Sequence, residues 1–174
     1  VVSIGLAGPT LAVPSSADIS VGLGRLEASA APGQVLTALG LGSCIGLMMI
    51  DPAARVGGLA HVMLPAVRGD ASLPGKFADT APPALLAAVE ALGARRHRLI
   101  VKIAGGAQMF SSGSGARTLN VGERNEAAVR EVLAKLGFSV AAADTGGTRG
   151  RTVRLDVTTG RTTVRLAGGQ ARDL

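Results

Sequence analysis

Cys44 and His61 are the two residues of this sequence whose types and spacing could support covalent catalysis. Cys44 is the only cysteine, and His61 is one of two histidines. A thiol becomes an effective nucleophile when a nearby imidazole lowers its pKa or accepts its proton. The segment "DPAARVGG" between them is typical of a turn that joins two strands. We therefore expect two strands joined by a short turn to bring Cys44 and His61 together.

A structural role for both residues is the competing interpretation. Free cysteines are among the most buried residue types, and a histidine in "LAHVMLP" can be a hydrogen-bonded core residue. Gly40 and Gly42 favour catalysis, because a backbone without Cβ atoms lets a substrate approach and its N–H groups near residues 42–44 could stabilise an oxyanion. The same glycines would also permit a β-bulge, so spacing alone leaves both interpretations open.

The rest of the chain must provide a scaffold for these two residues. Strand-like segments recur at "RLIVKIAGG", "FSVAAAD", "RTVRLDVTTG" and "RTTVRLAGG", and the last two predict a hairpin about "TTG". The patterns predict one helix capped by Asp79 and ended by Gly93, and a second helix over residues 124–136. Many strands with two helices predict an α+β layered domain.

Length and composition limit the number of domains and the environment of the chain. A chain of 174 residues is long enough for one hydrophobic core and too short for two comfortable domains. We expect a flexible N-terminal extension over residues 1–18 and one folded domain over residues 19–174. A single cysteine excludes an internal disulfide framework, and no Cys/His spacing resembles a zinc site. No apolar run approaches the roughly 20 residues that a membrane span needs, so we expect a cytoplasmic protein without membrane insertion.

The net charge of +6 raises the question of an acidic partner. Arginines supply most of the positive charge, but they are scattered along the chain. Three phenylalanines, with no tyrosine or tryptophan, offer almost nothing to stack on bases. We therefore expect no nucleic-acid binding, and we interpret the basic surface as one that attracts an acidic protein partner.

Five blocks follow one another along the chain: "LGLGSCIGLMMIDPAARVGGLAHVMLP", "GKFADTA", "KIAGGAQMF", "NVGERNEAAV" and "DTGGTRGRTV". They span about residues 20–168 and resemble, in order, the blocks of CheD, the bacterial chemoreceptor glutamine deamidase family. The resemblance implies a mixed β-sandwich with two main helices packed on the outside, related to other glutamine-deamidating cysteine hydrolases. It implies a hydrolase that converts selected receptor glutamines to glutamate and in some members also hydrolyses receptor glutamyl methyl esters. That chemistry calls for no metal or organic cofactor.

The resemblance also assigns roles to individual residues. The family's nucleophile matches Cys44, and its general base and acid matches His61. The family's threonine, six residues before the cysteine, corresponds to Ala38 here. Thr37 is one residue away, and on a regular strand a shift of one residue turns a side chain to the opposite face. Three explanations are open: a bulge lets Thr37 serve as the His-orienting group, another polar group or a backbone carbonyl orients His61, or catalysis is weakened.

Two kinds of partner follow from the same resemblance. One is the cytoplasmic domain of a chemoreceptor, a methyl-accepting chemotaxis protein, as the substrate. The other is a CheC-type phosphatase of the chemotaxis response regulator, with which some members pair. Because the family threonine is absent, a second function is credible: the chain could act mainly as an adaptor that binds a CheC-type phosphatase, with weak or no deamidase activity.

Overall fold

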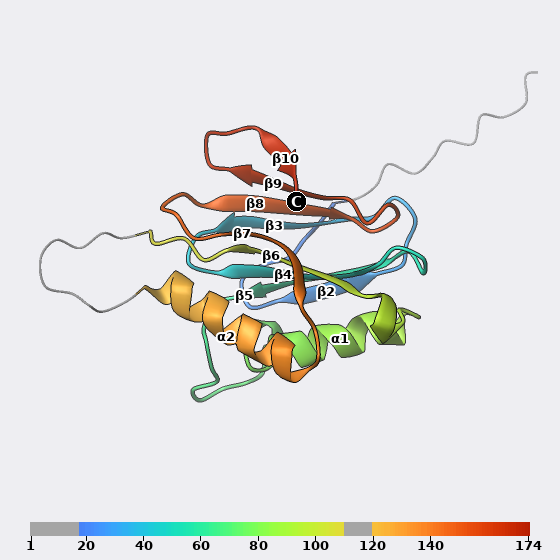
Figure 1. The fold of residues 1–174 in the computed structure, drawn as a ribbon, viewed down its shortest axis with the longest axis horizontal. Helices are drawn as coiled ribbons and strands as arrows, with labels where there is room; N and C mark the ends of the chain where they lie inside the picture. The colour runs from blue at the N-terminus through green and yellow to red at the C-terminus, as the bar shows by residue number, and fades with distance from the viewer. Residues whose placement is uncertain (1–17, 110–119) are drawn as a thin grey trace, which may run out of the picture.

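The computed structural model describes residues 18–109 and 120–174. Residues 1–17 of the expected N-terminal extension therefore lie outside the described residues. Within the described ranges, ten strands form two five-stranded sheets, and two α-helices cover one of these sheets. Figure 1 shows the resulting three layers, with sheet on sheet and both helices on one side. This architecture confirms the expected α+β fold, a mixed β-sandwich with two main helices on the outside.

The first sheet, which we call the outer sheet, lies farther from the helices (Figure 1). Its strands β1 and β3 are parallel, and its other neighbouring strands are antiparallel. The antiparallel pair of β8 and β9 confirms the hairpin predicted about "TTG". In spatial order the sheet contains β1 (Asp18–Ser20), β3 (Val35–Leu41), β8 (Arg151–Asp156), β9 (Thr162–Leu166) and β10 (Ala171–Asp173).

The second sheet, which we call the inner sheet, lies between the outer sheet and the helices (Figure 1). Every residue of its strands β4 and β5 is buried, because each face of these strands is covered by another layer. The antiparallel pairing of β4 with β5 confirms the predicted hairpin between Cys44 and His61. In spatial order the sheet contains β2 (Leu26–Ser29), β5 (Val56–Val62), β4 (Ile45–Asp51), β6 (Ile100–Gly105) and β7 (Val140–Thr145).

The helices α1 (Ala81–Ala91) and α2 (Val121–Lys135) pack on the open face of the inner sheet (Figure 1). Two short 3-10 helices, η1 (Pro74–Lys76) and η2 (Arg96–Arg98), lie before and after α1. Neither α-helix of the described segments has the length and apolar character that crossing a membrane requires.

Close contact between α1 and β5 depends on Gly58. A Cβ atom at Gly58 would lie 2.8 Å from Leu85 Cδ1 and from Val89 Cγ1. Both of these side chains are fully buried in the core between the helices and the inner sheet. A larger residue at position 58 would therefore push the helix away from the sheet.

The predicted starts of both helices differ from the observed ones. The N-cap of α1 is Thr80, so the predicted cap at Asp79 is wrong. The carboxylate of Asp79 instead accepts a hydrogen bond from the backbone N–H of Val67 at 2.9 Å. Helix α2 begins at Val121, earlier than in the predicted range 124–136. The N-cap of α2 is Asn120, whose side chain accepts a hydrogen bond from the backbone N–H of Glu123 at 3.1 Å.

Candidate active site

Cys44 and His61 lie on neighbouring strands and on the same face of the inner sheet. His61 pairs with Gly46 of β4, and Cys44 precedes that strand by one residue. Side chains two residues apart on a strand share a face, so Cys44 is a diagonal neighbour of His61. Such neighbours are about 7–8 Å apart, within reach of long side chains. Gly46 has no side chain of its own there, and the side chain of Leu41 covers it, with Cδ1 2.9 Å from where a Cβ atom would lie. The strand register thus places the two predicted residues on one face as diagonal neighbours.

Both residues point into the space between the two sheets. Cys44 packs against the core of this space, to which Met48 of β4 and Leu59 of β5 also belong. His61 shares the face of Leu59 because the two are separated by one residue. His61 is 2% exposed, whereas Cys44 is only partly buried. The thiol is therefore the more accessible member of the pair.

The imidazole of His61 is held by a backbone carbonyl. Its Nδ1 atom lies 3.3 Å from the carbonyl oxygen of Val21. A carbonyl can only accept a hydrogen bond, so Nδ1 carries the hydrogen and Nε2 presents a lone pair. Within the described ranges, Nε2 is buried without a hydrogen-bond partner. Burial lowers the pKa of His61 below its usual 6.5, and the hydrogen bond to Val21 opposes that shift. The ring is therefore neutral at pH 7 and can act as a base.

The thiol of Cys44 is protonated in the resting enzyme. Burial raises its pKa above the usual 9.0, and a hydrogen bond from the backbone N–H of Cys44 itself partly opposes this. Taken with the lowered pKa of His61, this describes a neutral thiol beside a neutral imidazole. Such a thiol needs a base to become a nucleophile.

The end of β6 supports the backbone around Cys44. The N–H of Gly106 donates to the carbonyl of Cys44 at 2.9 Å, and the N–H of Ala107 donates to the carbonyl of Gly42 at 2.7 Å. Gly105 has a φ of +117°, and a Cβ atom there would lie 2.1 Å from the carbonyl oxygen of Cys44. Only glycine permits this approach, which explains Gly105, the first glycine of the "KIAGG" block.

Asn125 of α2 is a site residue that the sequence analysis missed. Its Nδ2 atom donates to the carbonyl of Ser43 at 2.9 Å and to the carbonyl of Met63 at 2.8 Å. Ser43 directly precedes Cys44, and Met63 lies two residues after His61. One fully buried amide therefore ties together the two chain segments that carry the thiol and the imidazole.

A sequence signal for Asn125 does exist. It occupies the buried stripe of α2 together with Val129 and Leu133, at spacings of four residues. An asparagine on the apolar stripe of a helix needs buried hydrogen-bond partners. Its position therefore indicates a tertiary contact, although the sequence does not say with which carbonyls.

Thr37 and Ala38 lie on opposite faces of the outer sheet. Ala38 is fully buried in the core between the sheets, whereas Thr37 pairs with the exposed Arg154. In the part of the chain that the structure describes, the Thr37 hydroxyl has no hydrogen-bond partner. The contact that the structure contains at His61 Nδ1 is the backbone carbonyl of Val21.

A bulge that lets Thr37 serve was one of the three open explanations, and the irregularity of this strand falls after Thr37. The pairing of β3 with β8 shifts between Ala38 and Leu41, where Gly40 has a φ of +65°. The bulge therefore leaves Thr37 on its regular face and alters only the approach to Cys44. Gly42 lies in that approach, and a Cβ atom there would be 2.9 Å from Met109 Cγ, so Met109 packs directly on this glycine.

A β-sandwich that holds a partly accessible thiol beside a neutral imidazole has the groups that a cysteine-dependent hydrolase requires. A family model described as "CheD chemotactic sensory transduction" matches residues 63–166. The chain belongs to the CheD family.

Curated relatives cover most of the chain. A protein of Thermotoga maritima named chemoreceptor glutamine deamidase CheD is 45% identical over 149 residues, which is 86% of this chain and 92% of the relative. Proteins named probable chemoreceptor glutamine deamidase CheD are similar as well. The one from Moorella thermoacetica is 47% identical over 154 residues, 87% of this chain and 92% of the relative. The one from Desulforamulus reducens is 42% identical over 155 residues, 88% of this chain and 93% of the relative.

Proposed function

We propose that this chain is a chemoreceptor glutamine deamidase of bacterial chemotaxis. It hydrolyses the side-chain amide of selected glutamines in the cytoplasmic helices of chemoreceptors, which places the reaction in the cytoplasm. Membership of the CheD family and the names of the relatives support the substrate. The observation that carries the chemistry is the contact between His61 Nδ1 and Val21, because it leaves Nε2 as a base on the face that Cys44 shares. The deamidase domain that we propose comprises residues 19–174.

The first half of the proposed reaction forms a thioester. Nε2 of His61 accepts the proton of Cys44 as the sulfur attacks the amide carbon of the glutamine, so that a C–S bond forms and the carbonyl oxygen becomes an oxyanion. Backbone N–H groups near residues 42–44 stabilise this oxyanion. The protonated His61 then donates its proton to the leaving nitrogen, the C–N bond breaks, and ammonia departs.

The second half of the reaction releases glutamate. His61 is again neutral and accepts a proton from a water molecule as the water attacks the thioester carbon. The C–S bond breaks, and His61 returns the proton to the sulfur of Cys44. A receptor glutamyl methyl ester follows the same path, with methanol leaving in place of ammonia.

Mass spectrometry tests this function directly. The purified chain is incubated with a receptor cytoplasmic fragment, and peptides are analysed for conversion of glutamine to glutamate. We expect conversion by the wild type and none by Cys44→Ala. His61→Asn is a matched second variant, because its amide can still donate to the Val21 carbonyl while the base at Nε2 is gone. Absence of conversion by the wild type, or conversion by Cys44→Ala, would refute the proposal.

A second candidate function rests on Ala38. The family's threonine is absent at this fully buried position, which favours an adaptor that mainly binds a CheC-type phosphatase. A pull-down with that phosphatase separates the two functions. Binding that is retained by Cys44→Ala, together with no deamidation by the wild type, favours the adaptor.

A further inference from the structure

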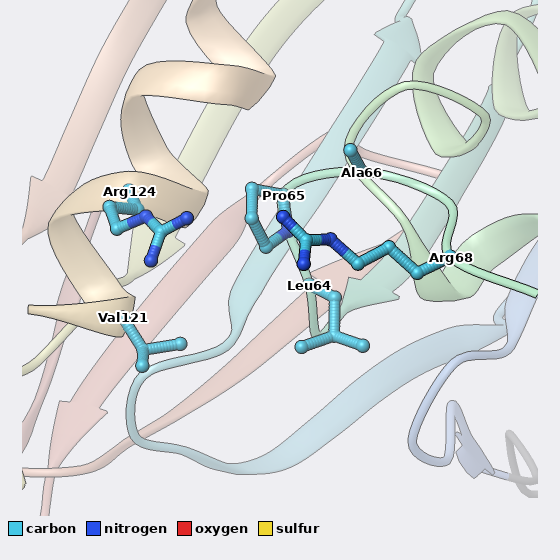
Figure 2. A pocket seen from close by; sticks show the side chains of 6 residues that line it. All are labelled: Leu64, Pro65, Ala66, Arg68, Val121 and Arg124. Atoms are coloured by element: carbon cyan, nitrogen blue, oxygen red, sulfur yellow. The ribbon is translucent and has the colours of Figure 1, made fainter. Parts of the chain in front are cut away.

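A groove opens between the chain segment that follows β5 and the first turns of α2. Its volume is about 470 Å³, which falls in the range of binding sites for small molecules or a few side chains. Figure 2 shows that the side chains of Arg68 and Arg124 extend toward one another from opposite walls. The groove is lined by Leu64, Pro65, Ala66, Arg68, Val121 and Arg124.

The groove adjoins the candidate active site through both of its walls. Leu64 follows Met63, whose carbonyl accepts a hydrogen bond from Asn125. Arg124 directly precedes Asn125, which also holds the carbonyl of Ser43 beside the thiol. Both walls of the groove are therefore continuous in the chain with the segments that Asn125 ties together at the candidate site.

The groove combines apolar side chains with the positive charges of two arginines, Arg68 and Arg124. Six of the fourteen arginines in the described residues have carboxylate partners, among them Arg98 with Asp51 and Arg154 with Asp18. Across residues 18–109 and 120–174, by contrast, Arg68 and Arg124 form no ion pair or side-chain hydrogen bond. Two guanidinium groups that face one another repel, and a carboxylate between them would relieve the repulsion and could accept several charge-assisted hydrogen bonds.

We propose that this groove binds an acidic stretch of the receptor helix next to the target glutamine. Apolar side chains of the helix lie against Leu64 and Val121, and a glutamate of the same helix face lies between Arg68 and Arg124. Residues three or four positions apart share a helix face, so this glutamate is one or two turns from the target glutamine. The inference rests on the proposed deamidase function and names the sequence context that the enzyme selects.

Binding measurements test the groove separately from the reaction. The protein carries Cys44→Ala so that a receptor cytoplasmic fragment is bound but not converted, and the Kd is measured by fluorescence anisotropy. The test variant is Arg68→Gln with Arg124→Gln. The control is Arg55→Gln with Arg165→Gln, which removes the same charge from two exposed positions in the β4–β5 turn and on β9.

We expect the test variant to bind the fragment about 3- to 10-fold more weakly, as two partly exposed ion pairs would give. The control should stay within about twofold, and the difference should shrink as salt is raised. Replacing the receptor glutamates next to the target by glutamine should weaken binding to the Cys44→Ala protein. It should have no further effect on the test variant, which is the sign of direct coupling.

Three results would overturn the inference: an unchanged Kd in the test variant, an equal loss in the control, or loss of binding to a CheC-type phosphatase with unchanged binding to the receptor fragment. The last result would assign the groove to the phosphatase. Failure of the proposed function is distinguishable, because it would appear as fragment binding without deamidation by the wild type. The comparison of Kd values would still decide what the groove does.

Discussion

The Nδ1 atom of His61 lies 3.3 Å from the carbonyl oxygen of Val21. The N–H of Val21 donates in turn to the carbonyl of Thr37 at 2.7 Å. Val21, which directly follows β1, therefore connects strand β3 of the outer sheet with the imidazole on β5 of the inner sheet. Because both contacts use main-chain atoms, they hold the imidazole without a polar side chain at position 37 or 38.

This relationship predicts that the side chain of Thr37 is dispensable. In Thr37→Val, the carbonyl that binds Val21 remains, so kcat/KM should stay within about twofold of the wild type. Thr37 is 6% exposed, and its buried hydroxyl has no hydrogen-bond partner within the described residues. Its replacement by a methyl group of similar shape should therefore leave the free energy of unfolding unchanged or slightly higher. Deamidation kinetics and urea unfolding measure the two quantities.

A second substitution, Ala38→Thr, introduces the family threonine and tests whether its absence weakens catalysis in this chain. It adds a hydroxyl at a fully buried position between the sheets, so a loss of stability of about 1–3 kcal/mol is expected. A rise in kcat despite that loss would mean that catalysis in this chain is weakened by Ala38.

For Thr37→Val, a drop of tenfold or more in kcat/KM would contradict the prediction above and assign the orienting role to the Thr37 hydroxyl.

The pH dependence of kcat/KM should show a broad plateau. Attack requires a neutral His61, and burial lowers the pKa of that ring below 6.5. The decrease of kcat/KM on the acid side should therefore occur below pH 6.5. The thiol of Cys44 has a pKa above 9.0 because it is buried, so the alkaline limb should fall above pH 9. Initial rates across this range test the prediction. An acid limb above pH 6.5 would contradict a neutral, buried imidazole.

The same shift makes stability depend on pH in a fixed direction. The unfolded chain protonates His61 at about its usual 6.5, whereas the folded chain binds that proton only at lower pH. The free energy of unfolding should therefore decrease as the pH falls from 6.5 through the folded pKa. In His61→Gln, which does not titrate, that part of the decrease should be absent when urea unfolding is followed at each pH.

The α+β class and the proximity of Cys44 and His61 were predictable because their signals are local, whereas the mixed β-sandwich followed from the family resemblance. A glycine-containing turn between two apolar stretches predicts a hairpin, and the hairpin places Cys44 near His61 whatever surrounds it. Val21 and Asn125 were not predicted as site residues, because they act over long sequence distances: the Val21 carbonyl contacts the His61 ring, and the Asn125 amide donates to two carbonyls. The cap at Thr80 shows the same limit: Asp79 is a good cap by type, but a tertiary hydrogen bond to Val67 engages it instead.

Asn125 should act as a positioning residue, and Asn120 of the same helix is its matched control. Asn125→Ala leaves the carbonyls of Ser43 and Met63 without their donor, at a cost of about 1–3 kcal/mol for each. Asn120→Ala removes the N-cap that accepts from Glu123, at a cost of about 1 kcal/mol.

Kinetics separate positioning from a merely structural role. At a temperature where both variants are folded, we expect Asn125→Ala to lower kcat by at least about tenfold with little change in KM, because the thiol and imidazole lose their common support. Asn120→Ala should retain the kcat of the wild type. If the two variants had equal kcat values, Asn125 would contribute only to stability and not to positioning.

The close approach of β6 to Cys44 can be tested at Gly105, with Gly93 as the control. Both glycines have positive φ, at +117° and +100°, so alanine is strained at either position, by about 1–2 kcal/mol. A Cβ atom at Gly93 meets nothing within 4 Å, whereas one at Gly105 would lie 2.1 Å from the Cys44 carbonyl oxygen. Gly93→Ala should therefore lose only the strain energy and keep full activity.

Gly105→Ala must move either β6 or the backbone of Cys44. We expect a loss in the free energy of unfolding larger than that of Gly93→Ala, and a fall in kcat among the molecules that remain folded, because the thiol shifts relative to His61. Thermal unfolding and deamidation rates at a temperature below both transitions measure the two effects. If Gly105→Ala matched Gly93→Ala in both measurements, the contact between β6 and the Cys44 carbonyl would not be needed to hold the nucleophile.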